Sequence, residues 1–198
     1  LQGQRLENVS KLILTASGGA FLNLPLEKLS EVSPAEALKH PNWNMGAKVT
    51  VDSATMVNKG LEVIEAFWLF GLGVRQIEVL VHPQSIVHSL VSFADGAQIA
   101  QLSTPDMKGP IAYGLTYPGP RLSGVLPELN LAERGSLDFL ELDTRRFPAV
   151  GLAKHCVEAG QGACAVFNAA NESAVERFLC GQLPFTGIVP LVHNTVER

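Results

Sequence analysis

A cluster of breaker residues divides this 198-residue sequence into two halves of different character. Five residues between 117 and 127 are Pro or Gly, which is typical of a connecting segment. Before this segment, apolar runs and turn signals predict strands at 11–15, 48–51, 76–81, 86–93 and 97–102. After it, helical patterns cover 148–159, 163–182 and 186–198. We therefore expect an α+β fold, a mixed sheet covered by helices on one face, followed by a small all-α helical domain.

The same pattern predicts three parts of the chain. A first domain covers residues 1–116, a linker covers 117–145, and a helical domain covers 146–198. The sequence starts at Leu1 and stops within a helical pattern, without a Gly or Pro stop signal. We therefore expect a fragment in which both the first and the last domain are truncated.

Composition excludes several classes of protein. Hydrophobic residues make up 46% of the chain and charged residues 17%, so it is not a disordered protein. The formal net charge of −4 argues against a nucleic-acid partner, which requires a basic surface. No apolar run approaches the roughly 20 residues of a membrane span, so we expect no membrane partner. Three cysteines cannot all pair, which favours a reducing compartment.

The strongest helical pattern lies at residues 53–69, with Asp52 or Ser53 as the expected cap. Spacings of four, three and four residues predict a buried stripe on this helix. The stripe consists of Val57, Leu61, Ile64 and Trp68. A shorter helix is expected at 34–39, with Ser33 as its cap.

A second face of the long helix carries an amide, an ammonium and carboxylates. Asn58, Glu62 and Glu65 share this face, and Lys59 flanks it. The amide and the ammonium suit a phosphate, and carboxylates suit Mg²⁺ or Mn²⁺. The alternative is a solvated face with an ordinary Lys–Glu pair.

Two loops are further candidates for ligand binding. Ser17, Gly18 and Gly19 follow a predicted strand, and their backbone N–H groups could hold a phosphate, or form an ordinary tight turn. The loop at 40–46 contains large apolar side chains, which either pack on the core or close over a ligand. We expect His82, His155 and His193 to be structural.

Several long blocks of the sequence, in order, resemble the 1-deoxy-D-xylulose 5-phosphate reductoisomerase family. They are residues 14–19, 40–46, 51–62, 81–89, 101–110 and 167–172. The resemblance implies an NADPH-dependent and metal-dependent enzyme that converts 1-deoxy-D-xylulose 5-phosphate to 2-C-methyl-D-erythritol 4-phosphate in the non-mevalonate isoprenoid pathway. The metal would be Mg²⁺ or Mn²⁺. It also implies a homodimer in the bacterial cytoplasm, or alternatively in a plastid-type organelle.

The resemblance implies that this chain lacks the family's N-terminal Rossmann-like domain and two of three metal carboxylates. The chain alone would then be inactive. The alternative function is a standalone phosphate-ligand-binding or dimerisation module without catalysis. The upstream sequence would discriminate between the two.

The resemblance also assigns roles to particular residues. Glu62 would bind the metal and, with His40 and Lys59, form the catalytic group. Gly46 would lie near the nicotinamide of NADPH. The substrate would contact Ser17, His40, Trp43, Ser53, Asn58, Lys59 and Glu62. The wall and loop of the active site would include Met45, His88, Pro105 and Met107.

Overall fold

The computed structural model describes residues 3–41, 43 and 45–198, and its centre is a five-stranded mixed sheet. The strand order is β4-β3-β1-β2-β5. The strands are β1 Val9–Ala16, β2 Ile77–Val81, β3 Val87–Phe93, β4 Gln98–Leu102 and β5 Leu140–Glu141. β1 and β2 are parallel, and the other pairs are antiparallel. The strands predicted at 11–15, 76–81, 86–93 and 97–102 are confirmed.

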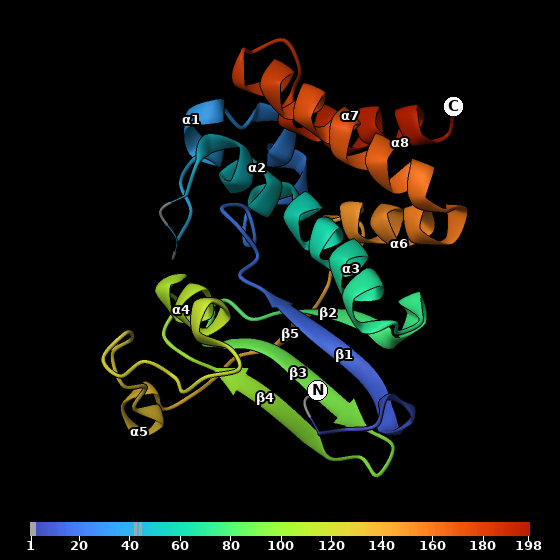
Figure 1. Ribbon diagram of the computed structural model, residues 1–198. Helices are drawn as coiled ribbons and strands as arrows, with labels where there is room; N and C mark the ends of the chain where they lie inside the picture. Colours follow the sequence, from blue (N-terminus) through green and yellow to red (C-terminus); the bar gives the residue numbers. More distant parts are fainter. Residues whose placement is uncertain (1–2, 42, 44) are drawn as a thin grey trace.

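The helices lie mainly on one side of this sheet (Figure 1). The α-helices are α1 Pro34–Ala37, α2 Ala47–Thr55, α3 Val57–Phe70, α4 Lys108–Thr116, α5 Leu131–Arg134, α6 Ala149–Ala159, α7 Gln161–Leu179 and α8 Ile188–Val196. Short 3-10 helices cover Leu6–Asn8, Leu26–Glu31, Val74–Gln76 and Phe185–Gly187. α3 and α6 cover the sheet, and α7 and α8 form a further layer (Figure 1). The expected mixed sheet with helices on one face is confirmed.

Two hydrophobic cores connect these layers. One lies between the sheet and the helices α3 and α6, and includes Leu12, Ile77 and Val63. The other joins the first half of the chain to α6, α7 and α8, and includes Val57 and Phe167. The helices after residue 146 thus share a core with the first 116 residues, and the boundaries at 116 and 146 stay a prediction. In the part of the chain described here, no helix is long and apolar enough to span a membrane.

The strand predicted at 48–51 is wrong, because this segment begins helix α2. Its β-branched residues Val49, Thr50 and Val51 favour a strand locally. The packed protein overrides this preference, since Val51 and Ala54 are buried in the second core. Asp52, which we expected as a cap, also lies within the helix.

The continuous helix predicted at 53–69 is wrong as well, because it is broken at Met56. This residue has a φ of 61°, in the left-handed region that ends α2, and α3 starts at Val57. The predicted buried stripe is also corrected. The buried residues of α3 are Val57, Gly60, Val63 and Ala66. Trp68 is 54% exposed, so the true stripe is shifted around the helix by about one position.

Gly60 is a point of close approach between α3 and the later helices. A Cβ atom at this position would lie 2.9 Å from the Ala153 Cβ and 3.3 Å from the Phe167 ring. Side chains larger than hydrogen would therefore force α3 away from α6.

The capped helix predicted after Ser33 is confirmed, although it is shorter than expected. The Ser33 hydroxyl accepts a hydrogen bond from the Glu36 N–H, and the Glu36 carboxylate accepts one from the Ser33 N–H at 2.8 Å. This reciprocal pair is a capping box, with Pro34 at the first helical position. It fixes the start of the segment that leads to His40.

Candidate functional site

One edge of the sheet gathers most of the candidate residues. The carboxyl ends of the parallel strands β1 and β2 lie at this edge, and so does the amino end of the antiparallel strand β3. The end of β4 lies there too, because Leu102 pairs with Val87. The sheet therefore brings three segments of the chain together: Ser17–Gly19, His88, and residues 103–107.

Three polar residues from separate segments meet at this edge. His40 Nε2 lies 2.9 Å from the Ser17 hydroxyl and 3.1 Å from the Ser53 hydroxyl. The Ser17 hydroxyl also accepts a hydrogen bond from the Gly19 N–H at 3.3 Å. We call Ser17, His40 and Ser53 the loop cluster, because a loop, a turn and helix α2 each supply one member.

Gly19 brings the strand β1 loop against helix α2. Its φ is 66°, and a Cβ atom there would lie 2.6 Å from the Ser53 carbonyl oxygen. Only glycine fits such an approach without displacing the helix backbone. This contact explains how Ser17 and Ser53, which are 36 positions apart, reach the same imidazole.

The hydrogen bonds of His40 define which ring nitrogen carries its proton. The Trp43 N–H donates to Nδ1 at 3.0 Å, so Nδ1 accepts and Nε2 carries the proton of the neutral ring. Burial lowers the pKa of His40, which favours that neutral form. The Nε2–H therefore donates toward the two serine oxygens. Since both hydroxyls act as acceptors here, the O–H group of each can donate to another acceptor.

Helix α3 carries a second polar group at its start. The Asn58 amide donates to Glu62 Oε1 at 2.8 Å, and the Lys59 ammonium contacts Glu62 Oε2. The Lys59 side chain is 12% exposed and the Glu62 side chain 36%. We call Asn58, Lys59 and Glu62 the helix cluster. The sequence predicted one face shared by Asn58, Glu62 and Glu65, with Lys59 beside it. In the structure Asn58 and Lys59 both contact Glu62, whereas Glu65 is exposed.

His88 lies at the same edge, within the electrostatic field of the helix cluster. Burial is the main cause that lowers the pKa of His88; the hydrogen bond to the Ser103 carbonyl opposes it, and the charges of His82 and then Lys59 add to the lowering. His88 Nε2 lies 2.9 Å from the Ser103 hydroxyl. Pro105 follows as a half-buried residue, whereas Met107 is 56% exposed. Of the predicted wall residues, Met107 is therefore the one open to solvent.

The loop at 40–46 connects His40 to helix α2. Trp43 and Met45 are half-buried, and Gly46, which precedes α2, is exposed. Asn42 and Asn44, which belong to the same predicted block, lie outside the described residues. The Trp43 N–H, which donates to His40 Nδ1, connects this loop to the loop cluster.

Carboxylates and other metal ligands do not converge within the described residues. Across 3–41, 43 and 45–198, no group of three His, Cys, Asp or Glu side chains is arranged to hold a metal ion. Glu62 supplies one oxygen ligand of the chemistry that Mg²⁺ prefers. A complete metal site would need further ligands in addition to Glu62.

Two buried residues next to the site had no predicted binding or catalytic role. Asp52 in α2 accepts a hydrogen bond from the Asn171 amide at 2.8 Å, and Asn171 lies on the distant helix α7. Both side chains are buried, at 1% and 0% exposure. The sequence could have indicated a buried polar contact at Asp52, because the nearby Val51 and Ala54 are apolar. It could not identify the partner, which lies 119 residues later.

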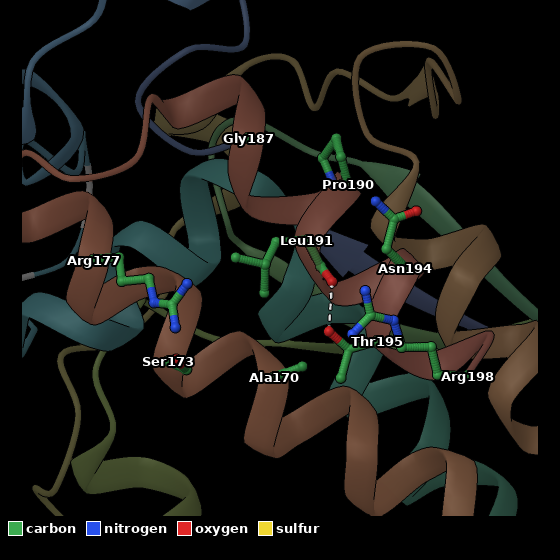
Figure 2. A pocket seen from close by; sticks show the side chains of 9 residues that line it. All are labelled: Ala170, Ser173, Arg177, Gly187, Pro190, Leu191, Asn194, Thr195 and Arg198. Atoms are coloured by element: carbon green, nitrogen blue, oxygen red, sulfur yellow. Dashed lines mark hydrogen bonds between the residues drawn. The ribbon is translucent and has the colours of Figure 1, made fainter.

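A groove between α7 and α8 is separate from this edge. It encloses about 640 Å³ and is shown in Figure 2. Its lining includes Ser173 and Arg177 from α7, and Asn194 and Thr195 from α8. None of the candidate residues from the sequence lines this groove, so the chemistry has to be sought at the sheet edge.

The chain matches two family models that together cover most of its length. The model described as "1-deoxy-D-xylulose 5-phosphate reductoisomerase C-terminal domain" matches residues 1–70. The model described as "DXP reductoisomerase C-terminal domain" matches residues 102–198.

Curated relatives and solved structures agree with these models. The chain is 59% identical to 1-deoxy-D-xylulose 5-phosphate reductoisomerase of Pelotomaculum thermopropionicum and 56% identical to that of Geobacter metallireducens. Each match covers 100% of this chain and 51% of the relative, so the chain spans about half their length. A crystal structure of DOX-P reductoisomerase in complex with NADPH, fosmidomycin and magnesium has a TM-score of 0.92 and 48% identity. That match covers 96% of this chain and 46% of the solved one.

Proposed function

Because the chain belongs to the 1-deoxy-D-xylulose 5-phosphate reductoisomerase family, we propose that it forms the substrate-phosphate site and part of the metal site of such an enzyme. The reaction is the NADPH-dependent conversion of 1-deoxy-D-xylulose 5-phosphate to 2-C-methyl-D-erythritol 4-phosphate. The substrate is a small phosphorylated sugar.

The loop cluster carries this proposal. His40 donates its Nε2–H toward two hydroxyl oxygens, so the Ser17 and Ser53 protons are available to an incoming phosphate. The backbone turn adds the Gly18 N–H at the end of β1, while the Gly19 N–H donates to the Ser17 hydroxyl. Charged acceptors such as phosphate make stronger hydrogen bonds than neutral ones.

The helix cluster extends the same site toward the reacting carbons. Lys59 supplies positive charge to the phosphate or to a developing oxyanion, and the Asn58 amide holds the Glu62 carboxylate in place. Binding the phosphate at one end orients the sugar at the other, which lowers the entropic part of the barrier. His88, Pro105 and Met107 form the wall behind it.

Magnesium or manganese fits this cluster only in part. Glu62 is the residue of this chain that would hold the ion, and its oxygen is a suitable ligand for either metal. When bound, the ion supplies Lewis-acid stabilisation of negative charge on the substrate oxygens. Since one carboxylate does not make a site, we expect this chain to be inactive without the other ligands.

Gly46 is the proposed contact for the nicotinamide of NADPH. Among the described residues other than its two chain neighbours, no atom lies within 4 Å of the position a side chain would take at Gly46, so a flat ring can approach its backbone. Trp43 and Met45 lie on the segment before it and would close over the substrate. Closure excludes water from the reactive centre.

A homodimer is part of the proposal, and dimerisation without catalysis is the second candidate function. Strand β4 is an outermost strand of the sheet, with no strand paired on its other side among the described residues, and its Ile99 side chain is 59% exposed. An open strand edge with apolar side chains is suited to pairing with a second copy. Analytical ultracentrifugation of this chain measures its assembly directly.

The test is NADPH oxidation that depends on 1-deoxy-D-xylulose 5-phosphate, with Mn²⁺ or Mg²⁺ present. Measured on the full-length enzyme, turnover supports the proposal and its absence contradicts it. Measured on this chain alone, we expect no turnover but detectable binding of inorganic phosphate by calorimetry. A chain that binds phosphate while the full-length protein does not turn over would favour the standalone binding module.

A further inference from the structure

Helix α2 cannot depend on its own sequence for stability. It has nine residues, whereas isolated helices below about 12 to 15 residues are marginal in water. Three consecutive β-branched residues, Val49 to Val51, lower its helix propensity further. Gly46 at its start provides no side-chain cap. The position of α2, and of Ser53 on it, therefore depends on contacts with the rest of the protein.

Asp52 makes the most specific of these contacts. Its side chain is 2% exposed, and each carboxylate oxygen has one partner. Oδ1 accepts from the Asn171 amide at 2.8 Å, and Oδ2 accepts from the Lys48 ammonium at 2.7 Å. A buried carboxylate is tolerated only when it is paired in this way. Lys48 is one turn earlier on the same helix, so Asn171 is the partner that fixes α2 relative to another element.

Asn171 is polar at a position otherwise suited to an apolar residue. It lies in α7 between the buried residues Ala170 and Ala174, and its own side chain is fully buried. Its Oδ1 atom has no hydrogen-bond partner within the described residues, which costs free energy. An ionised carboxylate only accepts, so the Asn171 amide nitrogen must face Asp52. The hydrogen bond to Asp52 therefore offsets part of the free-energy cost of burying the Asn171 amide.

The neighbour of Asp52 in the helix faces the candidate site. Consecutive helical residues point about 100° apart, so Asp52 contacts α7 while Ser53 contacts His40. The Ser53 backbone also lies against Gly19, with no room for a side chain between them. A rotation or shift of α2 would therefore move the Ser53 hydroxyl away from the His40 ring.

We propose that Asp52 and Asn171 are positioning residues, which hold α2 on α7 so that Ser53 completes the loop cluster. Neither residue touches the substrate; they act through the placement of Ser53. The inference rests on the proposed function, since that function gives the loop cluster its phosphate. It also means that the helical part of the chain contributes to the geometry of the sheet edge.

The first test compares Asn171→Leu with the reciprocal exchange D52N/N171D in the full-length enzyme. The single variant removes the donor to Asp52, whereas the exchange restores an amide–carboxylate pair with its charge moved to α7. We expect Asn171→Leu to raise the KM for 1-deoxy-D-xylulose 5-phosphate about tenfold or more, with kcat changed less. The exchange should recover most of this loss. Asn168→Leu, on the exposed side of the same helix, is the matched control.

A second measurement reads the position of Ser53 without any turnover. The nitrogen-15 and proton shifts of the His40 ring report whether Nε2 still meets the serine hydroxyls. We expect these shifts to differ from the wild-type values in Asn171→Leu and to equal them in Asn168→Leu. In the exchange D52N/N171D they should again be close to the wild-type values. If no protein, wild type included, turns over the substrate, the proposed function fails and the His40 shifts still decide the positioning role.

The opposite results overturn the inference. A folded Asn171→Leu protein with wild-type KM and unchanged His40 shifts would mean that the pair contributes stability only. If Asn171→Leu does not fold, the exchange decides: recovery of the fold together with KM and His40 shifts supports positioning. An exchange that folds but recovers neither KM nor the His40 shifts rejects it.

Discussion

The two polar clusters at the sheet edge are assembled in different ways. The helix cluster consists of residues three and four positions apart on α3, so one helical turn is enough to bring Asn58, Lys59 and Glu62 together. The loop cluster draws Ser17, His40 and Ser53 from three segments, and no local structure aligns them. The first requires only that a helix forms, whereas the second requires that strand, loop and helix dock correctly.

This difference predicts different responses to substitution. A change within the helix cluster should remove one chemical group and leave the surrounding structure unchanged. A change in the loop cluster should also release the segments that it holds together. The following four substitutions and conditions separate these two kinds of effect, starting with the largest.

Glu62→Gln should have the largest effect, because it removes the charge of the proposed metal ligand and keeps its shape. In the full-length enzyme we expect turnover to fall about 100-fold or more, which corresponds to the several kcal/mol that a metal ion supplies to charge stabilisation. The measurement is the initial rate of NADPH oxidation at saturating Mg²⁺. Glu158→Gln, on the surface of α6, is the control, and wild-type turnover in Glu62→Gln would falsify the metal assignment.

His40→Ala should come next, since it removes the ring that joins both serines. We expect the KM for substrate to rise about 10- to 100-fold, because displaced binding groups lose much of the benefit of orientation. Steady-state kinetics give the KM, and His193→Ala on the exposed side of α8 is the matched control. An unchanged KM would show that the two serines do not need the imidazole.

Lys59→Met should have a smaller effect, because methionine keeps the aliphatic chain and the helix propensity. We expect about a tenfold weaker binding of inorganic phosphate, in line with the loss of one charge-assisted hydrogen bond. Isothermal titration calorimetry on this chain measures it, with Lys28→Met as a control. The His40 ring shifts should stay as in the wild type, and a change in them would contradict the independence of the two clusters.

Acid pH should produce the smallest effect, and it should act through His40 of the loop cluster and through His88. Burial lowers the pKa of His40 in the folded state, so below its ordinary value near 6.5 the unfolded chain binds more protons. Stability should therefore be complete above about pH 6.5 and decrease as the pH falls through the folded pKa. Urea unfolding between pH 7 and 5 measures this slope, and His40→Gln should reduce it. His88→Gln should reduce it as well, since burial also lowers the pKa of His88.

The same distinction explains what could be predicted from the sequence. Strands β1 to β4 and the proximity of Asn58, Lys59 and Glu62 follow from local patterns, and the sequence predicted both. The short strand β5 lies in the segment that was predicted as a linker. Helix α2 was predicted in part as a strand, because Val49, Thr50 and Val51 favour one, and only burial and the Asn171 contact overrule them. The members of the loop cluster were predicted through the family resemblance, since no spacing rule connects residues 17, 40 and 53.

The distance along the chain between Asp52 and Asn171 also sets an order of events during synthesis. At about 5 to 20 residues per second, the ribosome needs roughly 6 to 24 s to make the 119 residues that separate them. Strand β1 and helix α3 can emerge and begin to fold within that interval, but until α7 appears the Asp52 carboxylate can pair only with Lys48 of its own helix, and its Oδ1 atom lacks the Asn171 amide. The nascent chain therefore contains all residues of the proposed phosphate site long before it can hold them in place.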